Sequence, residues 1–149
     1  MAVKGLYGAT RFTAMAKMTQ QMADIFRATK TFMLATASKD GVPNVAPMGM
    51  VILQDDLETI WIVDNYMNKT LCNMLDNPVA AISIVEAGAP PVSFEFKGKV
   101  TIENSGADYE KAVAFAHSKS DKYPAKNLIK IKIDEIYCET PGPGAGAKV

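Results

Sequence analysis

The sequence is poor in the residues on which most metal sites and acid–base sets depend. Among its 149 residues there are one histidine, His117, and two arginines, Arg11 and Arg27. A histidine-rich metal site and a Ser-His-Asp triad away from His117 are therefore excluded. His117 comes late in a predicted helix, where we expect a surface or C-terminal capping residue. Two arginines argue against capture of a phosphorylated substrate by an arginine cluster.

Cysteine and surplus charge are also scarce. Cys72 and Cys138 are far apart and form no Cys-x-x-Cys, so we interpret them as reduced thiols of a cytoplasmic protein. Lys+Arg and Asp+Glu both total 16, so the charge balance does not point to nucleic acid or to an anionic membrane. No apolar run approaches the roughly 20 residues that a membrane-spanning helix needs. Residues 1–7 lack the apolar core of a signal peptide.

The common nucleotide and metalloprotease motifs are missing as well. The sequence contains no G-x-G-x-x-G after a strand, no G-x-x-x-x-G-K-[ST] and no H-E-x-x-H. A dinucleotide-binding fold and a P-loop are therefore not supported. The length and a hydrophobic content of 48% predict one globular domain over residues 1–149, with a Pro/Gly-rich tail at 141–149.

The hydrophobic periodicity predicts a mainly β protein. We expect six strands, over residues 32–37, 44–53, 59–63, 79–85, 92–103 and 128–137, and three helices, over residues 14–29, 71–76 and 105–118. The Asp40-Gly41 pair marks a hairpin after the first strand. Short connections favour a closed or split antiparallel barrel with helices at its edges over a parallel sheet.

Four local patterns carry further predictions. The almost wholly apolar strand at 79–85 should be buried on both faces. The spacing of Ser105 and Asp108 resembles a capping box that opens a helix. The apolar pattern slips at Asp134-Glu135, which indicates a β-bulge. Pro47 and Gly49 interrupt the second strand, which indicates either an ordinary edge strand with a bulge or the close approach of a ligand.

The Lys69-Thr70 pair is the strongest candidate binding motif. It follows an apolar strand and opens a predicted helix, so a cation, a hydroxyl and free backbone N–H groups gather at a helix start. Such a helix start attracts phosphate. The alternative is an ordinary solvated helix cap. One phosphate-binding candidate without an evident acid–base set indicates that a cofactor supplies the reactivity.

Three segments, taken in order, resemble the FMN-binding split-barrel family, whose members are similar to pyridoxamine 5'-phosphate oxidase. They are LATASKDGVPNVAPMGMVI, IWIVDNYMNKTLCNMLDNPVAAISIV and VSFEFKGKVTIENSGADYEKAVAF. The resemblance covers about residues 32–137. Within the family, the sequence is most similar to the small dimeric FMN-binding proteins. It implies a six-stranded antiparallel split β-barrel with flanking helices. The most specific matches are Asp40, Gly41, Pro43 and Pro47 of the hairpin, Met67, Lys69 and Thr70, and Phe94 with Gly98.

The resemblance also implies a cofactor site for FMN. Lys69 and Thr70, with Asn68 beside them, would hold the phosphate. The second strand would lie along the isoalloxazine ring through Pro47, Met48, Gly49 and Met50. The end of the third strand would contact the ring and the ribityl chain through Val63, Asp64 and Asn65. Members of the family form homodimers with FMN at the subunit interface, where the partner's C-terminal tail often closes the site.

The expected function is that of an FMN-dependent oxidoreductase that passes electrons or hydride through the flavin N5 atom, with NAD(P)H or another redox partner. The sequence lacks the arginine and histidine groups that pyridoxamine-phosphate oxidases use for their substrate, so we do not expect that activity. The alternatives are an FMN-binding electron carrier or flavin store, a relative that binds haem or a deazaflavin, and a small structural protein. His117 is the only histidine that a haem could use.

Overall fold

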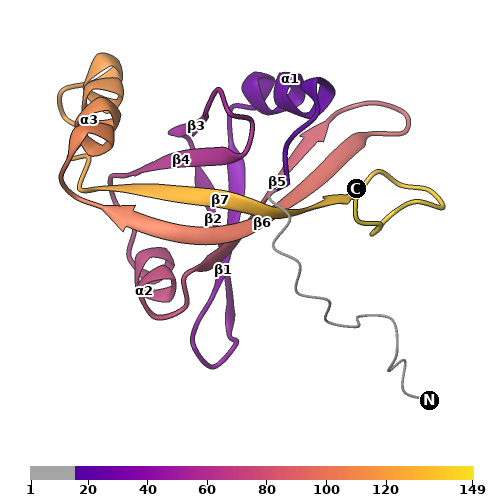
Figure 1. The fold of residues 1–149 in the computed structure, drawn as a ribbon, viewed down its shortest axis with the longest axis horizontal. Coiled ribbons are helices and arrows are strands. Elements are labelled where there is room, and N and C mark those ends of the chain that lie inside the picture. Colours follow the sequence, from indigo (N-terminus) through magenta and orange to yellow (C-terminus); the bar gives the residue numbers. More distant parts are fainter. Residues whose placement is uncertain (1–15) are drawn as a thin grey trace.

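The structure, a computed structural model, describes residues 16–149. In this part of the chain seven antiparallel strands form one sheet, and three helices lie outside it (Figure 1). The strands are β1 (Phe32–Ala37), β2 (Pro43–Met48), β3 (Val51–Leu53), β4 (Thr59–Asp64), β5 (Val79–Glu86), β6 (Val92–Glu103) and β7 (Asn127–Cys138). The helices are α1 (Gln20–Ala28), α2 (Lys69–Asp76) and α3 (Ala107–Lys119).

The strand order explains why the sheet curls into a split barrel. The order is β2-β1-β5-β6-β7-β4-β3, so β2 and β3 are the two edge strands. Only Gly49 and Met50 separate these strands in sequence. Because the three residue steps from Met48 to Val51 span at most about 11 Å, the sheet must roll until its edges almost meet. The predicted fold class, a mainly β split barrel with flanking helices, is therefore confirmed.

The predicted number of strands was one too low. Residues 44–53 were expected to form a single strand, whereas the structure divides them between β2 and β3. Pro47 cannot donate to a strand ladder and Gly49 has no side chain to pack, so the chain can leave one edge here and start the other. The Met50 carbonyl accepts a hydrogen bond from Val63 N at 3.0 Å, which joins the residue just before β3 to β4.

Helix α1 starts later than the periodicity predicted. The expected helix covered residues 14–29, and residues 14 and 15 lie outside the described part of the chain. The next residues are extended, because Ala16 N and Met18 N donate to the carbonyls of Ile133 and Leu57. Thr19 then caps α1 by accepting a hydrogen bond from Met22 N.

The interior of the barrel holds the main hydrophobic core. Three aromatic rings of this core pack together, with the Phe26 ring of α1 4.5 Å from that of Phe32 and 6.1 Å from that of Phe96. A second cluster forms where α3 packs on β4 and β7. Strand β4 is buried on both faces, because Ile60 faces the first cluster and Trp61 faces the second.

Strand β5 is buried on one face only, which corrects the expectation for residues 79–85. Ile82 and Ile84 point into the barrel, whereas Val79 and Val85 are 45% and 60% exposed. The opposite face of an antiparallel strand can remain solvated. An apolar outer face is thus left uncovered in the described chain.

The capping box predicted at Ser105 and Asp108 does not form. Gly106 is the N-cap residue of α3, without a side-chain hydrogen bond at the cap. Asp108 instead pairs with Lys130 on β7.

The Pro/Gly-rich tail folds back on its own strand. Lys148 forms an isolated bridge with Tyr137, and Val149 N donates to the Ile136 carbonyl at 2.9 Å. Strand β4 pairs with β7 only as far as Lys132. The tail therefore lies against the part of β7 that follows this pairing (Figure 1).

Candidate functional site

A cleft of about 760 Å³ lies between the start of α2 and the end of α3. Its volume is within the range of small-molecule and cofactor sites. The cleft is lined by residues from β2, from the β2–β3 connection, from the segment between β4 and α2, and from α3 and the loop that follows it. They are Asn44, Val45, Ala46, Pro47, Met48, Gly49, Met50, Val63, Asn65, Tyr66, Met67, Asn68, Lys69, Thr70, Phe115, Lys119 and Tyr123.

Nine of the ten residues expected from the sequence line this one cleft. They come from three separate stretches of the chain, and the rolling of the sheet brings them together. The nine are Pro47, Met48, Gly49, Met50, Val63, Asn65, Asn68, Lys69 and Thr70.

The first turn of α2 supplies hydrogen-bond donors to the cleft. The earliest intrahelical hydrogen bond is from Cys72 N to the Asn68 carbonyl at 3.0 Å. The backbone N–H groups of Lys69, Thr70 and Leu71 therefore have no acceptor among the described residues. Unpaired N–H groups and the helix dipole both favour an anion at this position.

Lys69 adds a positive charge at the same place. Its side chain is exposed and forms no ion pair with any residue in the range 16–149. Next to it, Thr70 is only 4% exposed, and its hydroxyl accepts a hydrogen bond from Asn44 Nδ2 at 3.1 Å. A cation, a hydroxyl and free N–H groups thus converge at one end of the cleft.

The break between β2 and β3 forms an apolar part of the lining. Gly49 is exposed and has open space where a side chain would begin. The sulfur of Met50 accepts a hydrogen bond from Asn65 Nδ2 at 3.3 Å, and Asn65 Oδ1 accepts one from Ala125 N at 3.0 Å. Asn65 therefore ties the strand break to the loop after α3.

Asp64 differs from the other expected site residues, because it does not line the cleft. Its side chain is fully buried. One carboxylate oxygen accepts a hydrogen bond from Met67 N at 2.8 Å, and the other accepts one from Asn127 Nδ2 at 2.7 Å. Asp64 thus shapes the turn that leads to Lys69, with both oxygens used inside the protein.

Helix α3 provides a wall that the sequence interpretation missed. Phe115 and Lys119 are four residues apart and therefore lie on one face of the helix, and Tyr123 follows in the next loop. Lys119 Nζ lies 5.4 Å from the centre of the Phe115 ring. The four-residue spacing was visible in the sequence, but nothing there indicated which surface this face of the helix would meet.

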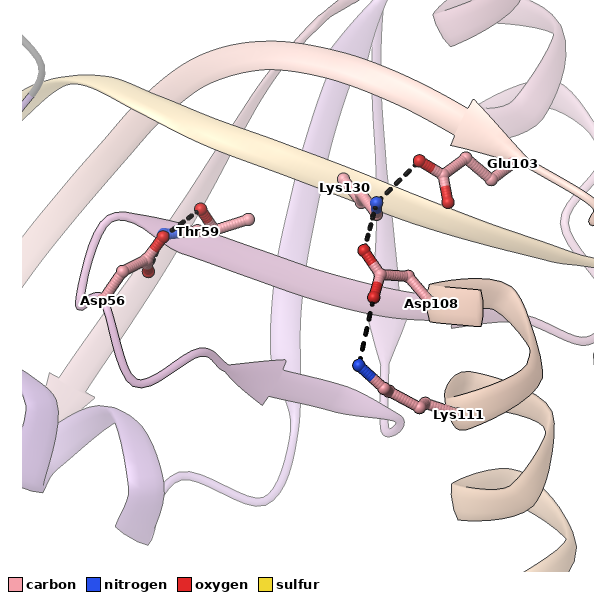
Figure 2. A network of polar contacts seen from close by, with 6 residues as sticks. All are labelled: Asp56, Thr59, Glu103, Asp108, Lys111 and Lys130. Carbon is pink, nitrogen blue, oxygen red and sulfur yellow. Dashed lines mark hydrogen bonds and ion pairs between the residues drawn. The ribbon is translucent and has the colours of Figure 1, made fainter. Parts of the chain in front are cut away.

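One ion pair, between Lys130 and Asp108, joins α3 to the sheet (Figure 2). Lys130 Nζ on β7 donates to Glu103 at 2.6 Å and to Asp108 at 2.8 Å. The hydrogen bond from Lys130 lowers the pKa of Asp108. Partial burial alone would lower the pKa of Lys130, but the hydrogen bonds to its two carboxylate partners outweigh this effect and raise it.

The charged side chains that line the cleft are both positive. Lys69 and Lys119 line it, and none of the described lining residues is an aspartate or a glutamate. The whole sequence has equal numbers of acidic and basic residues, so this local excess is a property of the cleft. The lining is suited to an anionic ligand with an apolar body.

No group of three or more metal-ligating side chains occurs within residues 16–149. His117 is exposed in the last turn of α3, as expected, and its Nε2 lies 3.1 Å from the Tyr123 carbonyl oxygen. Cys72 and Cys138 are free cysteines. No helix in the described range has the length and apolarity required to cross a bilayer.

The comparison with known families agrees with the fold. Residues 18–138 match the pyridoxamine 5'-phosphate oxidase family, and because this match covers most of the sequence, the chain belongs to that family. An uncharacterised protein of Methanocaldococcus jannaschii is 35% identical over 134 residues, which are 89% of this chain and 88% of that protein.

Solved structures share the architecture. HupZ of Group A Streptococcus has a TM-score of 0.73 and 28% identity, over 87% of this chain and 99% of that chain. An FMN-binding protein from Syntrophomonas wolfei has a TM-score of 0.66 and 16% identity, over 76% and 80% of the two chains. HutZ, the heme storage protein from Vibrio cholerae, has a TM-score of 0.65 and 14% identity, over 83% and 95%. The last two likenesses show the fold alone.

Proposed function

We propose that this member of the pyridoxamine 5'-phosphate oxidase family is a flavoprotein that binds FMN in the cleft between α2 and α3. The observation that carries the proposal is the convergence of Lys69, the Thr70 hydroxyl and the unpaired N–H groups of α2 beside an apolar strand break. The fold likeness to an FMN-binding protein agrees with it. The proposed compartment is the cytoplasm, with which two free cysteines are compatible.

The cleft fits the two chemically different ends of FMN. Lys69, Thr70 and the neighbouring backbone would hold the phosphate, because charged hydrogen bonds are stronger than neutral ones. The bare backbone at Gly49 and the apolar side chains of Met50 and Val63 would lie against the ring. The absence of carboxylates from the described lining removes the repulsion that a phosphate would otherwise meet.

When bound, FMN would supply the redox chemistry by exchanging electrons or a hydride through its N5 atom. The residues of the chain would bind the cofactor, orient it and exclude water. We propose oxidoreductase activity with NAD(P)H or another redox partner as donor. An electron carrier or flavin store without a dedicated substrate is the second candidate, because none of the described lining residues is a histidine or a carboxylate that could act as a general base.

We further propose that the protein is a homodimer that places FMN at the subunit interface. The outer face of the sheet carries an apolar patch, which we define as Met33, Ala35, Val45, Ala81 and Val85. Met33, Val45 and Val85 are 50%, 64% and 60% exposed. Such a patch on a small protein is typical of an interaction surface.

We infer that the occupant of this patch is a second copy of this chain. Glu95 and Lys97 border it on β6, where they form an ion pair at 3.7 Å. In a twofold interface the same surface meets itself, so a border that carries both charges can complement its own copy. Val45 belongs both to the patch and to the cleft. A partner seated on the patch would therefore form a further wall of the FMN site.

The absorption spectrum of the freshly purified protein tests the proposal most directly. We expect the spectrum of an oxidised flavin, release of FMN on denaturation, and tighter binding of FMN than of riboflavin in titrations. A colourless protein that takes up no FMN, or one that instead binds haem, would refute it. Steady turnover of the flavin-loaded protein with NAD(P)H would support the oxidoreductase, and inertness the carrier or store.

A further inference from the structure

We propose that Asn44 is a positioning residue that turns the Thr70 hydroxyl into a hydrogen-bond donor for the FMN phosphate. The inference rests on the proposed function and adds a residue that the sequence interpretation did not include. Asn44 lies near the start of β2, directly opposite Thr36 on β1. It is half-buried, it lines the cleft, and its Nδ2 atom is 3.1 Å from Thr70 Oγ1.

The chemistry of a hydroxyl explains why this contact matters. A threonine hydroxyl has one hydrogen to donate and two lone pairs that accept. The Asn44 amide donates to one lone pair, so the hydrogen is not used in this contact. A threonine within a helix commonly donates this hydrogen to the carbonyl four residues earlier. No such bond from Thr70 occurs in the described structure.

The Thr70 hydrogen is therefore left for a ligand acceptor in the cleft. Burial strengthens the effect, because Thr70 is only 4% exposed and a hydroxyl with few alternative partners keeps a fixed orientation. The phosphate that Lys69 and the N–H groups of α2 attract would be such an acceptor. Asn44 would thus act on the phosphate through Thr70.

Helix α2 has two other amide contacts with the sheet, and these make the role of Asn44 separable from simple docking. Asn73 Nδ2 donates to Thr36 Oγ1 at 3.1 Å, and Asn77 Nδ2 donates to the Ala37 carbonyl at 3.2 Å. Neither Asn73 nor Asn77 lines the cleft. Asn73 therefore provides a matched control, with the same kind of bond between an amide and a threonine hydroxyl.

The test compares dissociation constants for FMN and riboflavin, which differ only in the phosphate. In the full-length protein, Asn44→Asp replaces the donor by a group that only accepts, so it would take the Thr70 hydrogen. We expect FMN binding to weaken by about tenfold or more, the scale of a lost charged hydrogen bond, with riboflavin binding unchanged. Asn73→Ala should lower thermal stability but leave the ratio of the two constants as in the wild type.

A double-mutant cycle separates positioning from direct contact and from added charge. Asn44→Ala should reduce the preference for FMN in the wild type and in Thr70→Ser, which keeps the hydroxyl, but not in Thr70→Ala. If Asn44→Ala reduced the preference for FMN equally in the Thr70→Ala background, Asn44 would contact the ligand itself, and the proposal would be overturned. The proposal would also be overturned if Asn44→Ala left the ratio of the two dissociation constants unchanged in a protein that still prefers FMN. If the wild type binds neither compound, the proposed function fails, and this inference fails with it.

Discussion

Gly98 on β6 lies so close to Lys132 on β7 that a Cβ atom at position 98 would overlap the Lys132 carbonyl oxygen. The register between the two strands shifts at this point. Lys97 is paired with Glu135 and Gly98 with Ile133, which leaves Asp134 as the extra residue of a β-bulge. A bulge bends and twists its strand, and here it lies in the two longest strands of the barrel.

Replacing Gly98 by alanine should therefore destabilise the fold. The added methyl group meets backbone atoms, which cannot move aside as a flexible side chain can. We expect a loss of about 1–3 kcal/mol in the free energy of unfolding, the usual cost of overpacking a filled interior, measured by urea denaturation. Gly144→Ala is the control, because its Cβ would meet open space and Gly144 lies outside the cleft. Equal stability of the two variants would contradict the close approach.

The bulge also shows which parts of the fold the sequence predicts well. Asp134-Glu135 was recognised because the strand alternation slips there, and a local slip in period is visible in a single sequence. The separation of β2 from β3 was not predicted in full. Pro47 and Gly49 signalled an interruption, but which sheet edge each half joins depends on strand pairings far away in the sequence.

In the proposed FMN site, Lys69→Ala should weaken FMN binding by about 1.5–3 kcal/mol, because it would remove a charged hydrogen-bond partner of the phosphate. Riboflavin binding should change little, since riboflavin has no phosphate. Fluorescence titration of the apoprotein with each compound measures both effects. Lys17→Ala provides the control, because Lys17 is exposed and lies outside the cleft. Unchanged FMN affinity in Lys69→Ala would remove this lysine from the site.

The site shows a similar limit of prediction. The Lys69-Thr70 pair follows a strand and opens a helix, so its chemistry can be inferred from local order alone. Asp64 stands in the same segment and looks equally polar, but only the fold shows that its carboxylate is used by Met67 N and Asn127. The wall formed by α3 needed tertiary information, because its sequence does not specify what it packs against.

Asp108→Asn should lower the free energy of unfolding at neutral pH. It should also make this free energy depend less on pH in the acid range. Lys130 holds the pKa of Asp108 below its ordinary range in the folded protein, so the folded state binds fewer protons than the unfolded state. The stabilisation is therefore fully present above about pH 4 and is lost as the pH falls through the lowered pKa.

Urea midpoints at pH 7 and pH 3 measure this difference. The gap between wild type and Asp108→Asn should be present at pH 7 and should shrink at pH 3. Asp121→Asn is the control, because Asp121 is exposed and forms no ion pair within residues 16–149. A gap of the same size at both pH values would show that the Asp108 charge does not contribute.

The proposed homodimer can be tested at the centre of the apolar patch. Ala35 on β1 is exposed between Val45 of β2 and Ala81 of β5. An arginine there would place an unpaired charge in the interface, where desolvation is costly, so Ala35→Arg should elute and sediment as a monomer. FMN affinity should fall too, because the partner would no longer form part of the lining of the cleft. Ala114→Arg, on the exposed side of α3, should stay dimeric. A wild type that is monomeric at micromolar concentration with FMN bound would rule out the shared site.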